Sequence, residues 1–317
     1  MTTAPRHSVT CLVIWVLASS AATSSAQLAL RHDQVIPLTI AEGTTQDMGR
    51  VFTVPIECNG QQGHFVLGCF GPSRISKSFA GQCGAEVFTD DSLDKYRDAD
   101  GKWIFAGSAR VTIKFGGKER ELVLSVMKDE YCQKPEKEGM IGNELIAPFQ
   151  WEVDPTVPSL TLRPPATLPA GKPLAILSMR ITHEGYFINV RVRNVTQEVA
   201  LMPSSSFLQA GPELQRKWDF NSGKKLDLEV NRFGNVREFQ LRGDDAVELR
   251  ADLRETNLPV ALVGDVKHPA PLSMLNSGLG ACVLNRFVYC IEPRRQQLRL
   301  MRRVADEQGR PLMPAKR

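Results

Sequence analysis

Most sequence features that mark a catalytic, metal or nucleic-acid site are missing from this chain. Its 317 residues carry a net charge of only +4, and no basic stripe is interleaved with aromatic residues, so we expect no nucleic-acid partner. No two cysteines have the CxxC spacing of a zinc or redox site, and the five histidines form no HxxxH or HExxH pattern. The GxSxG and GxGxxG motifs are also missing. We therefore predict no metal and no other cofactor.

Long apolar runs are missing as well, and the longest one lies at the N-terminus. Arg6 and His7 precede Cys11 to Ala18 (CLVIWVLA), which is too short to cross a bilayer comfortably, and small residues then continue to Ala26. This order is typical of a secretory signal peptide, which we assign to residues 1–26. We therefore predict an exported protein (periplasmic, cell-envelope or secreted) with no membrane span after signal cleavage.

Cysteine is sparse, but its count fits export. Removal of the signal takes Cys11 with it, and an even number of cysteines in an exported chain permits disulfides. We predict the pairs Cys83–Cys132 and Cys282–Cys290, because each pair stays within one half of the chain. Buried free thiols are the alternative, since spacing alone does not fix connectivity. The six remaining cysteines are Cys58, Cys69, Cys83, Cys132, Cys282 and Cys290.

An internal repeat is the most informative feature that is present. Gly139 to Pro155 (GMIGNELIAPFQWEVDP) aligns without gaps with Ser277 to Pro293 (SGLGACVLNRFVYCIEP). The offset is 280 − 142 = 138, as the repeat glycines Gly142 and Gly280 show. Each copy predicts a glycine at a close backbone approach, a short helix, a strand and a returning strand. The other matches at this offset are Leu145/Val283, Phe149/Phe287, Asp154/Glu292, Pro155/Pro293, Leu160/Leu298 and Leu162/Leu300.

The rest of the chain predicts a mainly β fold. Alternating apolar runs surround turn signals at Asn59-Gly60, Gly116-Gly117, Arg193-Asn194 and Phe233-Gly234, which is typical of β-hairpins. Residues 168–173 (LPAGKP) form a Pro/Gly linker between the two halves.

Each half also contains a strand that enters a turn of small residues, as in HFVLGCFGPSRIS at residues 64–76 and EVALMPSSSFL at 198–208. Together with the repeat, these segments resemble the retropepsin/pepsin-like aspartic proteases in a two-lobed bacterial form. The resemblance implies two similar β-barrel-like lobes with short helices. It places the lobes at residues 30–166 and 170–303, followed by a flexible tail at 304–317.

The chain departs from this family where the catalytic Asp-Thr-Gly turns belong. The first turn holds Gly68, Cys69 and Phe70, and the second holds Met202, Pro203 and Ser204. The family's chemistry needs two adjacent carboxylates that share one proton, so that one activates water while the other acts as an acid. We therefore expect a non-catalytic protein that retains an inter-lobe groove, in which an extended peptide or an envelope partner binds by strand addition.

Two alternatives stay open on the sequence alone. An aspartic-type endopeptidase with a displaced acid pair would need other carboxylates. Asp154 and Glu292 occupy equivalent repeat positions, but both precede a proline turn, which favours two turn-capping acids. A purely structural exported β protein is the other alternative, and it predicts a groove filled by Phe70 and Met202.

Overall fold

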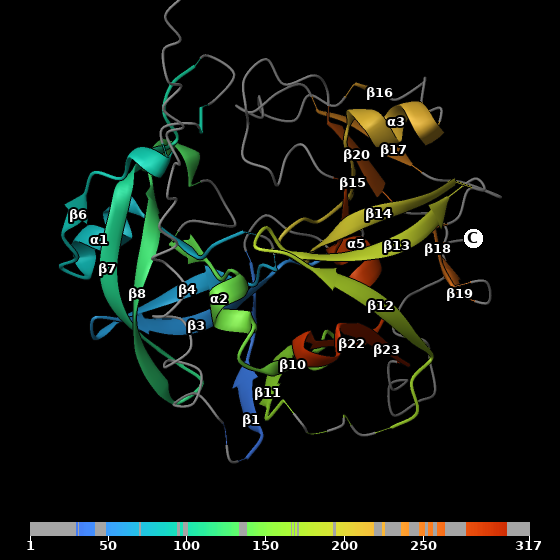
Figure 1. Ribbon diagram of the computed structural model, residues 1–317, viewed down its shortest axis with the longest axis horizontal. Helices are drawn as coiled ribbons and strands as arrows, with labels where there is room; N and C mark the ends of the chain where they lie inside the picture. The colour runs from blue at the N-terminus through green and yellow to red at the C-terminus, as the bar shows by residue number, and fades with distance from the viewer. Residues whose placement is uncertain are drawn as a thin grey trace, which may run out of the picture.

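The computed structural model describes the chain in segments. They are residues 30, 32–41, 49–69, 71–93, 96–97, 101–132, 138–165, 167, 169, 171–192, 195–218, 224–225, 236–240, 247–250, 253–255, 259–263 and 277–302. The predicted signal peptide (1–26), Phe70 and the predicted tail (304–317) lie outside the described residues. The fold is mainly β with short helices, as predicted (Figure 1).

Strands β1 to β11, with the helices between them, make up what we call the first half. These elements are β1 Gln34–Pro37, β2 Thr39–Ile40, β3 Phe52–Cys58, β4 Gln61–Val66, β5 Arg74–Ser76, α1 Lys77–Gln82, β6 Val87–Phe88, η2 Asp91–Leu93, β7 Phe105–Phe115, β8 Lys118–Met127, η3 Asp129–Tyr131, β9 Gly139–Met140, α2 Asn143–Ile146, β10 Gln150–Asp154 and β11 Ser159–Arg163.

Strands β12 to β23 make up the second half. Its elements are β12 Ala175–Ile181, β13 Tyr186–Val192, β14 Val195–Met202, β15 Leu208–Ala210, α3 Pro212–Trp218, β16 Lys224–Lys225, β17 Val236–Gln240, β18 Val247–Arg250, β19 Leu253–Glu255, β20 Pro259–Val263, β21 Gly278–Gly280, α5 Ala281–Leu284, β22 Val288–Glu292, η4 Pro293–Arg295 and β23 Gln297–Met301.

Six strands of the first half form a closed barrel. Its strands follow the order β3-β4-β9-β5-β8-β7, and the pairing of β7 with β3 at Cys58↔Ile113 closes the ring. The predicted turn at Gly116-Gly117 connects β7 to β8, and both glycines have positive φ angles. Alternating side chains of β3 and β7 point into the barrel, where Val54, Ile56 and Ile113 are fully buried.

An antiparallel sheet connects the two halves. Its order is β1-β11-β10-β22-β23-β12, and the strands of the predicted repeat, β10 and β22, pair with each other at its centre through Trp151↔Ile291. The sheet continues through β13, β14, β21, β15, β20, β17 and β16 (Figure 1). In the described part of the second half, β13 pairs with β18, and no pairing of β13 with β17 closes a second ring. The fold is therefore one closed barrel joined to a large sheet.

Candidate functional site

The same crossing of strands occurs beside both predicted turns. In the first half β4 runs parallel to β9, β9 is antiparallel to β5, and β5 is parallel to β8. In the second half β14 runs parallel to β21, β21 is antiparallel to β15, and β15 is parallel to β20. Val66↔Met140 and Ala200↔Gly278 are corresponding pairs, so Gly68 and Met202 stand at corresponding positions two residues further on.

The backbone of the two turns is held in the same way. The Asn143 amide donates a hydrogen bond to the Gly71 carbonyl at 3.0 Å, and the Ala281 amide donates one to the Ser205 carbonyl at 2.7 Å. The residue before each donor is a repeat glycine, and each lies against the turn. A Cβ atom on Gly142 would lie 2.5 Å from the Gly71 oxygen, and one on Gly280 would lie 2.7 Å from the Ser205 oxygen. Only a residue without a side chain fits at either crossing.

Each turn has one glycine packed against one methionine, but the two residue types are at opposite positions in the two halves. A Cβ on Gly68 would lie 2.8 Å from Met140 Cγ and 2.9 Å from its Sδ, because this thioether covers the glycine. In the second half the thioether is Met202 itself, and it covers Gly278, whose Cβ would lie 2.8 Å from Met202 Cγ. Gly68 and Met202 correspond, and so do Met140 and Gly278. A buried methionine therefore covers the first turn position at which the resemblance calls for an aspartate, and another buried methionine occupies the second.

The surroundings of the first turn are apolar and phenolic. Cys69 is 1% exposed, and burial raises the pKa of its thiol. Tyr186 and Tyr289 are also buried; burial raises their pKa values, and the nearby Cys69 raises them further. Neither phenol oxygen has a hydrogen-bond partner among the described residues. An ionisable group placed here would therefore be held in its neutral form.

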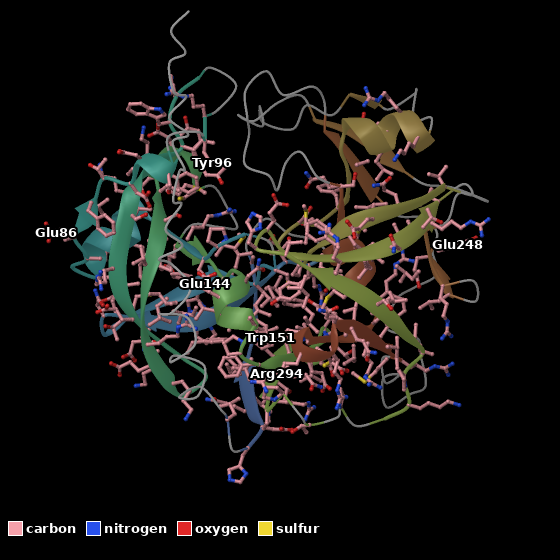
Figure 2. The ribbon with its side chains drawn as sticks, viewed as in Figure 1. Glu86, Tyr96, Glu144, Trp151, Glu248 and Arg294 are labelled. Atoms are coloured by element: carbon pink, nitrogen blue, oxygen red, sulfur yellow. The ribbon has the colours of Figure 1, made fainter. Side chains whose placement is uncertain are left out.

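The Glu144 carboxylate beside the first turn has a structural role. Glu144 on α2 lies between the barrel and the second half (Figure 2), and its Oε1 accepts a hydrogen bond from the Ser73 amide at 2.7 Å. The Ser73 hydroxyl in turn accepts a hydrogen bond from the Gly142 amide at 2.7 Å. Glu144 therefore fixes the turn.

Asp154 and Glu292 do not form an acid pair. The register of β10 with β22 continues to Gln150 opposite Glu292, so Asp154 and Glu292 lie four residues apart along the strands, or roughly 13 Å. Asp154 Oδ1 caps its turn by accepting from the Thr156 amide at 2.7 Å, as predicted.

The prediction of a turn-capping role was wrong for Glu292. This side chain is 2% exposed and accepts from Arg299 Nε at 2.7 Å and from Arg295 at 3.2 Å. Its carboxylate therefore pairs with two arginines of η4 and β23 and does not cap the turn.

The two halves contact each other through corresponding loops. The Gly71 amide donates to the Glu184 carbonyl at 2.5 Å, and Asn143 Nδ2 donates to the His183 carbonyl at 3.2 Å. From the other side, Asn285 Nδ2 donates to the Arg50 carbonyl at 2.6 Å. Neither these asparagines nor Met140 stands out as a site residue in the sequence, although Met140 and Gly278 are opposite each other in the repeat alignment (278 − 140 = 138).

The remaining predicted site residues are placed as follows. Pro203 is buried and Ser204 is half-buried at the second turn. All six cysteines from Cys58 onward are free thiols, and the structure gives each predicted pair separate surroundings. Cys83 lies against Cys58, whereas the Cys132 thiol points to the Met127 carbonyl at 3.8 Å. Cys282 and Cys290 belong to different buried clusters.

The described part of the chain contains no group of three or more acidic, histidine or cysteine side chains placed to hold a metal ion. Within the same part, no helix is long and apolar enough to cross a membrane. No protein-family model matches the sequence, and no curated protein matches it either.

Proposed function

We propose that this chain is an exported, non-catalytic relative of the two-lobed aspartic proteases, and that it binds an extended peptide or an envelope partner between its halves. The shared crossing of β4, β9, β5 and β8 with β14, β21, β15 and β20 supports a duplicated origin of the two halves. The order of these pairings agrees with the order of the repeat in the sequence.

The exchanged methionine–glycine pairs carry the non-catalytic part of the proposal. Peptide hydrolysis of this type needs two carboxylates within a few ångströms of each other around one water molecule. Gly68 has no room for a side chain, and Met202 presents a thioether that neither donates nor accepts a proton. Because the turns keep their backbone hydrogen bonds, the missing acids reflect a change of chemistry within the same framework.

Surface exposure at the turns supports binding. Beyond the buried positions, Pro72 is exposed and Gly71 is half-buried in the first turn, and Ser204, Ser206 and Phe207 are half-buried in the second. Hydroxyl groups and one aromatic ring suit the recognition of a peptide backbone and of an apolar side chain. No carboxylate from these turns would repel an acidic partner.

The test combines cleavage and binding in one preparation. The full chain is incubated at acidic and neutral pH with a library of unstructured decapeptides, and binding is followed by fluorescence anisotropy and cleavage by mass spectrometry. We expect binding without new termini, and a loss of about tenfold in affinity for Phe207→Ala, as for a central aromatic contact. Ile176→Ala is the matched control, since Ile176 is an exposed apolar residue on β12, a strand that belongs to neither turn.

Each outcome separates the three functions. Binding without cleavage supports the proposal. Cleavage that persists in a purified preparation and depends on an Asp or Glu of this chain would establish a peptidase with a displaced acid pair. The lack of any bound peptide across the library would leave a structural protein and overturn the binding function.

A further inference from the structure

Two cysteines that are far apart in the sequence meet inside the barrel. Cys58 is the last residue of β3, and Cys83 immediately follows α1 as its C-cap. Both side chains belong to the same buried cluster, and each thiol is close enough to shift the pKa of the other. Next to them, Asn59 Nδ2 donates to the Cys83 carbonyl at 3.2 Å, so the backbones as well as the sulfur atoms are neighbours.

The surrounding structure fixes both cysteines in this position. Asn59 is bound to β7 twice, since its amide donates to the Thr112 carbonyl at 2.8 Å and its Oδ1 accepts from the Thr112 amide at 2.8 Å. The Cys83 amide donates to the Phe79 carbonyl of α1 at 3.0 Å. These hydrogen bonds to β7 and α1 hold the two cysteines next to each other within the regular structure of the barrel, and not in a loose loop.

We propose that Cys58 and Cys83 form a disulfide that closes the segment from the end of β3 to the end of α1. This segment contains β4, the first turn with Gly68 and Cys69, and β5. The oxidant is a disulfide of the class R–S–S–R, such as oxidised glutathione. The Cys83 thiolate attacks it and releases RS⁻, and the Cys58 thiolate then attacks the mixed disulfide and releases a second RS⁻. Two cysteine protons are lost and one Cys58–Cys83 bond is formed.

Burial determines when this reaction takes place. Desolvation raises the pKa of Cys58 to about 12 and also raises that of Cys83, on which the nearby Cys58 thiol acts in the opposite direction. Because the thiolate is the reacting form, the folded reduced protein oxidises slowly, and Cys83 is the residue that attacks first. Oxidation during folding, before β3 and α1 are buried, is therefore much faster than oxidation of the folded protein.

The experiment starts from the reduced, unfolded full chain, which has seven cysteines. The chain is refolded in a glutathione redox buffer, unfolded again without reductant and treated with N-ethylmaleimide. We expect five labelled cysteines (7 − 2 = 5) and one linked peptide pair. Trypsin leaves Cys58 and Cys69 together in residues 51–74, so a second digestion with chymotrypsin, which cuts after Phe65, is needed to separate them.

Variants make the assignment specific. Cys58→Ser and Cys83→Ser should each abolish the linkage, whereas Cys69→Ser should leave it intact. Reduction should lower the melting temperature of the refolded wild-type protein by roughly 5 °C, with no such shift in Cys58→Ser. Seven labelled cysteines after oxidative refolding would overturn the proposal, and so would a linkage of Cys83 to Cys132. Neither outcome depends on whether the protein binds a peptide.

Discussion

Replacing Gly68 with aspartate restores the family's acid at the first turn, and we expect it to destabilise the protein without creating an enzyme. The new Cβ would lie 2.5 Å from the Ile141 carbonyl oxygen, a backbone atom that cannot move aside as a side chain can. It would also lie 2.8 Å from Met140 Cγ. Steric crowding of this kind costs about 1–3 kcal/mol in a packed interior.

The carboxylate adds a second penalty that can be measured separately. Gly68→Ala introduces only the clash, whereas Gly68→Asp also buries an acid beside the neutral Cys69 thiol. Burial raises the pKa of such an acid, so its destabilisation is small below about pH 4 and increases as the pH rises. We expect Gly68→Asp to lose roughly 2 kcal/mol more than Gly68→Ala at pH 7.

Urea unfolding at pH 4 and pH 7 provides the measurement, and Gly81→Ala is the matched control. Gly81 lies within α1, its Cβ would meet nothing within 4 Å, and alanine there should stabilise the helix by about 0.5–1 kcal/mol. Wild-type stability of Gly68→Asp at both pH values would refute the packing argument. New peptidase activity in this variant would refute the expectation that one restored carboxylate creates no enzyme.

Three further predictions concern other parts of the fold. Glu292→Gln should lower the free energy of unfolding by roughly 3 kcal/mol in urea titrations, because it leaves the Arg299 charge without its buried partner, whereas Glu121→Gln, in an exposed pair, should change it by under about 0.5 kcal/mol. Tyr289→Phe should be neutral or stabilising, since the phenol has no hydrogen-bond partner among the described residues. Burial raises the Tyr289 pKa above 10.0, so the wild type should lose stability as the pH rises above about 10, and in urea unfolding at alkaline pH the variant should lose less. Asn285→Ala should cost about 1 kcal/mol in thermal unfolding through its lost bond to the Arg50 carbonyl.

Local patterns predicted the elements of this fold well. The repeat predicted short helices after Gly142 and Gly280, and the structure has them at Asn143–Ile146 and Ala281–Leu284. The strand that the repeat predicts after each helix is β10 in the first copy and β22 in the second. Turn residues and alternating apolar side chains are properties of short segments, so the sequence displays them directly.

Properties that depend on distant neighbours could not be predicted in this way. Asp154 and Glu292 have the same local sequence context, yet only Glu292 is buried, with Arg295 and Arg299 against its carboxylate. Cys58 and Cys83 meet because barrel closure brings a hairpin end to a helix end. The exchange of methionine and glycine becomes visible only when two different offsets are used. Met140 corresponds to Gly278 at 278 − 140 = 138, and Gly68 corresponds to Met202 at 202 − 68 = 134, so no ungapped alignment contains both pairs.

The central sheet has a consequence for the order in which the chain can fold. β22 and β23 are synthesised after all the other strands that the structure describes, yet they occupy the middle of the sheet between β10 and β12. Until they emerge from the ribosome, β10 and β12, which are synthesised earlier, each expose an unpaired edge. Such edges are prone to pair with other chains, and contacts between residues such as Trp151 and Ile291 are slow to form. The sheet is therefore completed when β22 and β23 pair with β10 and β12. Truncation before β22 should leave an aggregating product rather than a smaller folded one.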